Sequence, residues 1–137
     1  MAEEKLFEGQ IKKYFHSIGI YPGNYPENRM KAPQIGWYTK IWGGGFQKSG
    51  IPDIIACING FMVAVEVKAS NGKASELQKL NISRINAANG IGLILYPEGL
   101  EDFQHIIERV IRCNIHIQEL TALKSVNSSS KCDIWMK

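Results

Sequence analysis

The pair Asn59-Gly60 constrains the fold of this chain more than any other feature, because it separates two apolar, β-prone runs at residues 52–58 and 61–69. Asn-Gly between such runs is the strongest short-range signal for a two-residue β-hairpin. A two-residue turn fixes the pairing of the two strands, and Asp53 then lies directly opposite Glu66. A β-bulge would shift this register by one residue.

Apolar residues at helical spacing predict helices on both sides of the hairpin. The helices are expected at residues 3–18, between the capping box that starts at Ser75 and the stop at Asn89-Gly90, and at 101–112, with further strands at 37–42 and 91–96. Their apolar faces consist of Phe7, Ile11, Tyr14, Phe15 and Ile18; Leu77, Leu80, Ile85 and Ala88; and Phe103, Ile106, Ile107, Val110 and Ile111. This order of elements indicates an α/β fold, a mixed sheet flanked by helices.

At 137 residues the chain is long enough for one hydrophobic core and too short for two. We expect residues 1–113 to form the domain and residues 114–137, where the periodic signal fades, to form a C-terminal extension. No stretch approaches the roughly 18 apolar residues of a membrane span, and the N-terminus has no signal-peptide core. Three widely spaced cysteines fit neither a disulfide framework nor a zinc clip, so a cytoplasmic location is expected.

Two carboxylates and an amine meet on one face of the hairpin. Alternation along the second strand places Glu66 and Lys68 on one face and Val63, Val65 and Val67 on the other. Such residues are often a solvated face or an edge-strand ion pair, but like charges directly opposite one another destabilise a sheet. Lys68 would supply one positive charge to neutralise them, and a hard divalent cation, which takes oxygen ligands, would supply the rest. The net charge of +3 permits a polyanionic partner without requiring one.

The motif residues carry a family resemblance. Ser49-Gly50-Ile51-Pro52-Asp53, then Glu66-Val67-Lys68 and Ser75-Glu76-Leu77-Gln78, resemble the virus-type replication-repair nuclease (VRR-NUC) domain of the PD-(D/E)XK nuclease superfamily, over roughly residues 7–108. The resemblance implies a restriction-endonuclease-like fold and metal-dependent cleavage of DNA, with branched or flap DNA as substrate. It suggests either a homodimer acting on branched DNA or a monomer acting on flaps. A rival interpretation is a catalytically silent DNA-binding accessory protein of recombination on the same fold.

The resemblance also implies a role for each site residue. Asp53, Glu66, the backbone carbonyl of Val67 and a glutamate of the first helix would hold Mg²⁺ or Mn²⁺. Lys68 would orient the attacking water or help to deprotonate it. Glu8 is the best match for the helix glutamate and Glu4 the weaker one; the alternative for Glu8 is an ion pair with Lys12. Gln78 would lie beside the site, or would serve only as the capping partner of Ser75.

Lysines and aromatic residues surround the triple glycine at 43–45, which predicts a turn or flap. Lys40 and Lys48 are candidates for contact with DNA phosphates, since basic side chains supply most of the affinity for nucleic acid. Exposed aromatic side chains can stack on unpaired bases. For Trp37 and Trp42, however, the pattern favours a place in the core.

Overall fold

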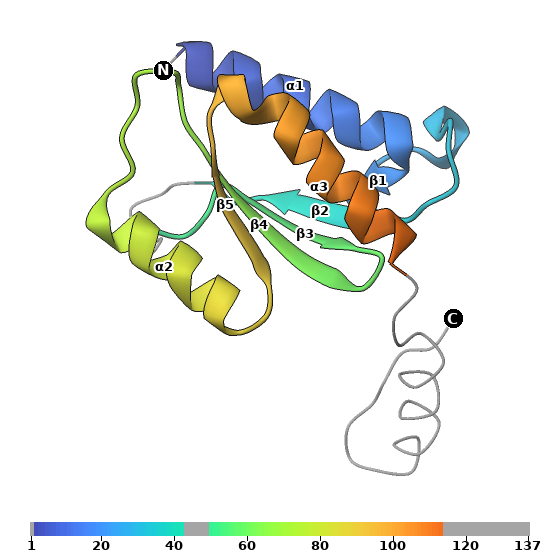
Figure 1. Ribbon diagram of the computed structural model, residues 1–137. Helices are drawn as coiled ribbons and strands as arrows, with labels where there is room; N and C mark the ends of the chain where they lie inside the picture. The colour runs from blue at the N-terminus through green and yellow to red at the C-terminus, as the bar shows by residue number, and fades with distance from the viewer. Residues whose placement is uncertain (1, 43–49, 114–137) are drawn as a thin grey trace.

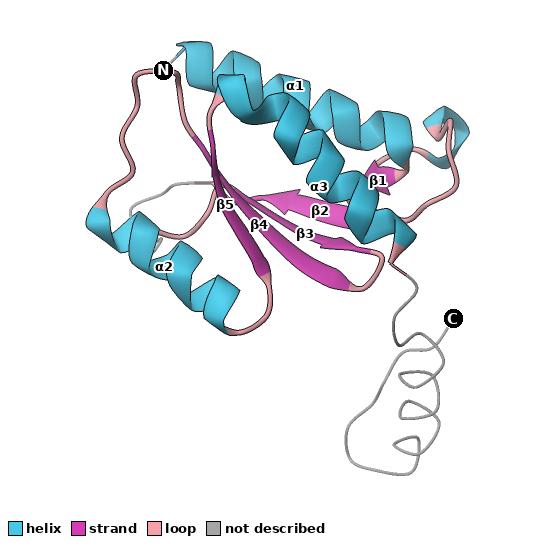
Figure 2. Cartoon of the chain, in the orientation of Figure 1, coloured by secondary structure: helices cyan, strands magenta, loops and turns pink. Residues whose placement is uncertain are grey.

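Five strands form one mixed sheet with helices on both of its faces (Figures 1 and 2). The computed structural model describes residues 2–42 and 50–113. The elements are α1 (Ala2–Ile18), β1 (Ile20–Tyr21), the 3₁₀ turn η1 (Glu27–Arg29), β2 (Gly36–Lys40), β3 (Ile54–Ile58), β4 (Phe61–Val67), α2 (Glu76–Ala87), β5 (Ile91–Leu95), η2 (Pro97–Gly99) and α3 (Leu100–Arg112). The strand order follows the chain; β1 with β2 and β4 with β5 are parallel, and the two central pairs are antiparallel. The α/β class is confirmed.

The β3–β4 hairpin has the predicted turn and register. Asn59 and Gly60 adopt φ of 51° and 84°, as a type I′ turn requires. Ile54 pairs with Val65, so no bulge shifts the register. The Asn59 amide also donates to the carbonyls of three residues at the end of α3, Val110 at 3.0 Å, Ile111 at 3.2 Å and Cys113 at 2.7 Å. The same turn residue therefore holds α3 against the hairpin.

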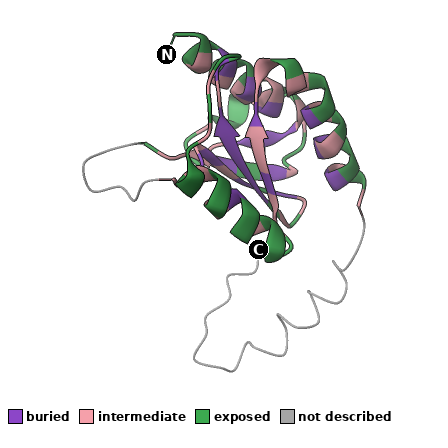
Figure 3. Ribbon diagram, turned by 60° about the vertical axis from the view of Figure 1, so that its left-hand side comes forward, coloured by how far each residue is buried: buried purple, intermediate pink, exposed green. Residues whose placement is uncertain are grey.

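The core lies between the sheet and the helices α1 and α3, which cover the same face (Figures 1 and 3). Alternate residues of β4 point into it, as expected: Val63, Val65 and Val67 are fully buried. The helices contribute Phe7, Ile11, Phe15, Phe103, Ile107 and Val110. The predicted apolar faces of the first and third helices are thus confirmed at their centres.

Helix α2 turns a different face to the sheet from the one predicted. Leu77 and Leu80 are 44% and 48% exposed, and Ile82 is the one buried residue of the helix, which is largely green in Figure 3. Helix α2 lies on the opposite side of the sheet from α1, over β4 and β5. A Cβ at Gly92 would lie 3.1 Å from the Ile82 carbonyl oxygen, so glycine there permits this close approach. Packing through Ile82 turns Leu77 and Leu80 outward.

Other differences from the sequence predictions concern strand ends and tryptophans. The two-residue strand β1 was not predicted; it pairs with β2 through Ile20 and Gly36. The prediction that Trp37 and Trp42 belong to the core is wrong, because they are 42% and 75% exposed. Trp37 lies between the buried residues Gly36 and Tyr38, so strand alternation turns it to the other face.

No helix in the described ranges is long and apolar enough to cross a membrane. The predicted C-terminal extension at 114–137 and the triple glycine at 43–45 lie outside the described residues. The proposed separation of the domain from that extension stays a prediction.

Candidate active site

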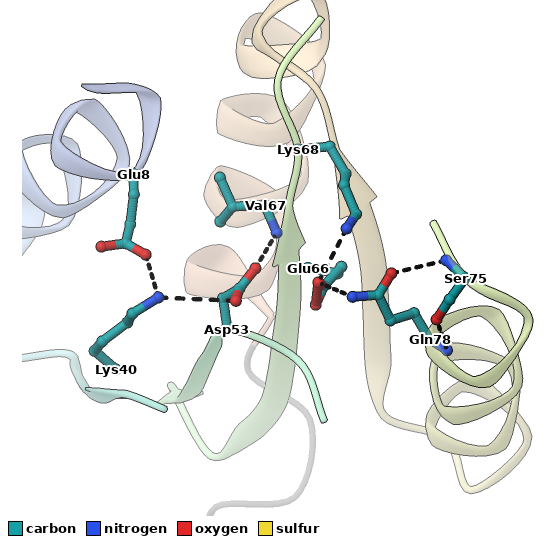
Figure 4. Close-up of polar contacts among 8 residues, drawn as sticks. All are labelled: Glu8, Lys40, Asp53, Glu66, Val67, Lys68, Ser75 and Gln78. Carbon is teal, nitrogen blue, oxygen red and sulfur yellow. Dashed lines mark hydrogen bonds and ion pairs between the residues drawn. The ribbon is translucent and has the colours of Figure 1, made fainter. Parts of the chain in front are cut away.

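Asp53 and Glu66 lie together where the hairpin strands end. Strand β3 begins at Ile54, so Asp53 stands one residue before the paired segment, and the register extends to place it opposite Glu66. The Asp53 carboxylate accepts a hydrogen bond from the backbone N–H of Val67, at 2.8 Å from Oδ2 (Figure 4). Its side chain thus takes the place of the backbone carbonyl that a continuing strand would offer. The predicted juxtaposition of the two carboxylates is present.

The turn before Asp53 is held against helix α2. Gly50 has φ of +83°, which favours glycine, and a Cβ at this position would lie 2.6 Å from Leu77 Cγ. Pro52 is buried, and the Asp53 carbonyl accepts a hydrogen bond from Ile41 N–H at 2.7 Å. Close packing on α2 and on the end of β2 therefore positions the Asp53 side chain.

Glu66 is the buried polar residue of the described core, at 3% exposure. Its Oε1 accepts a hydrogen bond from Gln78 Nε2 at 2.7 Å, but its Oε2 is buried without a hydrogen-bond partner among the described residues. Burial, and then the neighbouring charge of Asp53, raise the pKa of Glu66 to about 7. A buried carboxylate oxygen without a donor is costly, so binding a proton or a cation at this oxygen would stabilise the site.

Gln78 completes the capping box and also lies beside Glu66. Its side-chain Oε1 accepts a hydrogen bond from the Ser75 backbone N–H at 2.8 Å. The Gln78 backbone N–H donates to Ser75 Oγ at 3.1 Å, which completes the predicted capping box. Because the amide has both a donor and an acceptor, its Nε2 remains free to bond Glu66. Gln78 precedes Ile82 by one helical turn, so it shares the face of α2 that meets the sheet.

Lys68 lies on the same side of the sheet as Glu66, with Nζ 3.5 Å from Glu66 Oε1. The Lys68 side chain is only 13% exposed. A partly buried ammonium next to a carboxylate supports the expected pairing. The same ammonium remains within reach of a group bound at the pair of carboxylates.

Glu8 joins the cluster through a lysine. Its carboxylate forms an ion pair with Lys12 at 3.1 Å. It forms a second ion pair with Lys40, and Lys40 Nζ also lies 3.7 Å from Asp53 Oδ1 (Figure 4). Burial raises the pKa of Glu8, but the hydrogen bonds and charges of Lys40 and Lys12 together lower it by more. The pKa of Glu8 is therefore below its ordinary value of 4.5. Both interpretations of Glu8 therefore have support: it pairs with Lys12, and it faces the Asp53 side of the site.

Lys40 contacts carboxylates rather than standing free on the surface, with its side chain 18% exposed. Three carboxylates (Glu8, Asp53 and Glu66) are matched by three lysines (Lys12, Lys40 and Lys68). Lys48, the other lysine proposed for DNA contact, lies outside the described residues. The weaker candidate Glu4 has no contact with the cluster among the described interactions. Its neighbour Glu3 accepts a hydrogen bond from Ser70 N–H at 3.0 Å, which ties α1 to the loop after β4.

The donor set fits a hard divalent cation. Mg²⁺ is usually held by one or two carboxylates, with waters and substrate phosphates completing its coordination. Asp53 and the unpartnered oxygen of Glu66 supply two carboxylates, and Val67 turns its N–H toward Asp53, so its carbonyl faces the same side. The described residues include no group of three or more His, Cys, Asp or Glu side chains placed to hold one metal ion. Glu8 as a third acidic ligand stays a prediction.

No protein-family model, no curated protein and no solved structure matches this chain. A function for this chain therefore has to be inferred from its motif residues and from the geometry of the site.

Proposed function

We propose that this chain is a divalent-metal-dependent endonuclease that hydrolyses DNA phosphodiester bonds, as its resemblance to the VRR-NUC domain and the restriction-endonuclease-like fold implies. The observation that carries the proposal is the unpartnered, buried Oε2 of Glu66 beside Asp53. A buried carboxylate without a partner destabilises the isolated chain, and a bound cation would compensate its charge and stabilise the fold. Branched or flap DNA is the proposed substrate class.

Each side chain has a defined part in the proposed reaction. Asp53, Glu66 and the Val67 carbonyl would hold Mg²⁺ or Mn²⁺, which polarises a phosphate and lowers the pKa of bound water. Gln78 holds the Glu66 carboxylate in place through its 2.7 Å hydrogen bond. The Lys68 ammonium orients the attacking water and offsets negative charge as the bond from phosphorus to the leaving oxygen breaks.

The direct test is cleavage of duplex, flap, splayed-arm and four-way-junction DNA with Mg²⁺ and with Mn²⁺. Wild type should cut at least one of these, and Asp53→Asn should abolish cleavage and weaken Mn²⁺ binding measured by calorimetry. Glu76→Gln is the matched control, since it removes an acidic charge that is 92% exposed on α2. Unchanged Mn²⁺ affinity in folded Asp53→Asn would exclude the shared site. The panel also separates the two proposed substrates, branched DNA for a homodimer and flaps for a monomer.

Lys40 and Lys48 are proposed to contact DNA phosphates. Lys40 would have to leave Glu8 or Asp53 to do so, which cation binding at the carboxylates favours. Removing both lysines should lower the slope of log affinity against log salt by about 0.9 per lost duplex phosphate contact. An unchanged slope would locate the DNA surface elsewhere.

The alternative is a catalytically silent DNA-binding accessory protein of recombination. One observation favours it: the three lysines already balance the three carboxylates, and Lys40 occupies the position between Glu8 and Asp53. On this account the purified protein binds DNA but does not cut any member of the panel with either metal. Metal-dependent cleavage that Asp53→Asn abolishes would exclude it.

A further inference from the structure

Trp42 is an exposed aromatic side chain at the rim of the candidate active site. It follows Lys40 by two residues, just beyond the end of β2, and is 75% exposed. The ammonium groups of Lys12 and Lys40 lie 6.0 and 5.8 Å from the centre of its ring. Both lysines also contact Glu8, so the tryptophan lies close to the ion pairs that connect α1 to Asp53.

Among the residues that the structure describes, none buries the Trp42 ring. Trp42 is absent from the hydrophobic core cluster, whereas the aromatic residues of that cluster, such as Phe15 and Phe103, are fully buried. A large aromatic ring left in water gives up the free energy that burial would supply. The exposed ring offers a stacking surface, and the two nearby ammonium groups attract anions, so together they suit a nucleotide, whose base can stack and whose phosphate is negative.

We propose that Trp42 stacks on an unpaired nucleobase of the DNA strand at the site, with Lys12 and Lys40 beside the adjoining phosphates. Proteins that bind single strands combine aromatic platforms with basic side chains in this way. A base inside a duplex already stacks on its neighbours, so the platform selects DNA with unpaired nucleotides at the site. This inference rests on the proposed nuclease function and narrows its substrate class to flaps, splayed arms and junctions that expose a base.

The first experiment compares binding of a fluorescein-labelled 15-nucleotide oligothymidylate with binding of a 15-base-pair duplex, with Ca²⁺ in place of Mg²⁺. Trp42→Ala should weaken binding of the single strand by about 5- to 150-fold, the range expected for loss of one base–aromatic stack. The ratio of single-strand to duplex affinity should fall with it. Trp42→Phe should retain most of the affinity, because it keeps a ring.

Trp37→Ala is the matched control. Trp37 is also exposed, at 42%, but lies three residues before Lys40 on β2, roughly 10 Å away along the strand. Its removal should leave the affinity ratio at the wild-type value. Equal losses in Trp37→Ala and Trp42→Ala would overturn the assignment.

A spectroscopic measurement reports stacking directly. The chain has three tryptophans, at 37, 42 and 135, so the double substitution Trp37→Phe, Trp135→Phe leaves Trp42 as the sole indole. Its fluorescence should fall when the oligothymidylate binds. Binding without quenching would overturn the stacking proposal.

Cleavage then separates this inference from the proposed function. If the wild type cleaves flaps faster than duplex and Trp42→Ala reduces this preference, the result supports both the nuclease proposal and the stacking role. Cleavage with the same flap-to-duplex rate ratio in Trp42→Ala overturns the stacking role and leaves the nuclease proposal standing. An inactive wild type that nevertheless binds the oligothymidylate through Trp42 overturns the nuclease proposal alone, and wild type that binds no single strand overturns the stacking role.

Discussion

Replacing Glu66 by glutamine should stabilise the metal-free protein at neutral and alkaline pH. The neutral amide retains the acceptor for Gln78 and removes the charge that burial and Asp53 oppose. Burial and the neighbouring Asp53 raise the pKa of Glu66 from 4.5 to about 7 on folding. At about 1.4 kcal/mol per unit, the ionised side chain lowers the free energy of unfolding by about 3 kcal/mol.

The sign follows from proton uptake. Between pH 4.5 and about 7 the folded chain holds a proton on Glu66 that the unfolded chain has released, so the wild type loses stability as pH rises through this window. The advantage of Glu66→Gln should therefore be near zero below pH 4.5 and reach its full size above pH 7. For a domain of this size it corresponds to a melting-temperature difference on the order of 10 °C. Two charged groups face residue 66, those of Asp53 and Lys68, and both are present in the wild type and in the variant.

The assay is urea unfolding of both proteins in EDTA, from pH 4.5 to 8.5. A difference that is independent of pH, or a variant less stable than wild type at pH 8, would refute the reasoning. Glu8→Gln is the control of opposite sign. The lowered pKa of Glu8 gives the wild type stability that is present above pH 4.5 and lost as pH falls, so this variant should be less stable at pH 7. Adding Mn²⁺ should narrow the difference at Glu66, because at 100 times Kd the wild type gains about 2.7 kcal/mol and Glu66→Gln gains less.

Three further predictions concern single side chains. Lys68→Ala should reduce single-turnover cleavage at saturating Mg²⁺ by orders of magnitude while DNA and metal affinities change little, and Lys68→Arg should not restore the rate fully; a folded alanine variant that cuts at the wild-type rate ends this role. Ser75→Ala should cost about 1 kcal/mol in urea unfolding with cleavage retained, whereas Gln78→Ala should lose both stability and rate because it also frees Glu66; equal rates in the two variants would make Gln78 a cap alone. Asn59→Gly keeps the turn conformation but removes the amide that bonds the end of α3, so it should cost about 1 kcal/mol, and an unchanged urea midpoint would contradict that role.

Local features of the chain were determined by the sequence alone. Asn59-Gly60 sets the turn, and the turn sets the register that brings Asp53 and Glu66 together. The capping box at Ser75 and the apolar face of α3 follow from residues three and four apart. All of these depend on short-range geometry, in which a spacing along the chain translates directly into a direction in space.

The tertiary structure decided which face of α2 is buried and where Lys40 and Trp42 lie. Leu77 and Leu80 have the spacing of a buried face, yet the close approach at Gly92 turns Ile82 to the sheet and carries Gln78 toward Glu66. Lys40 reaches Glu8 from an element 32 residues away, and no periodicity encodes such a pairing. Periodicity shows that a residue is apolar or charged and which face it shares, but contacts between elements depend on how closely their backbones can approach, and only the packed chain decides that.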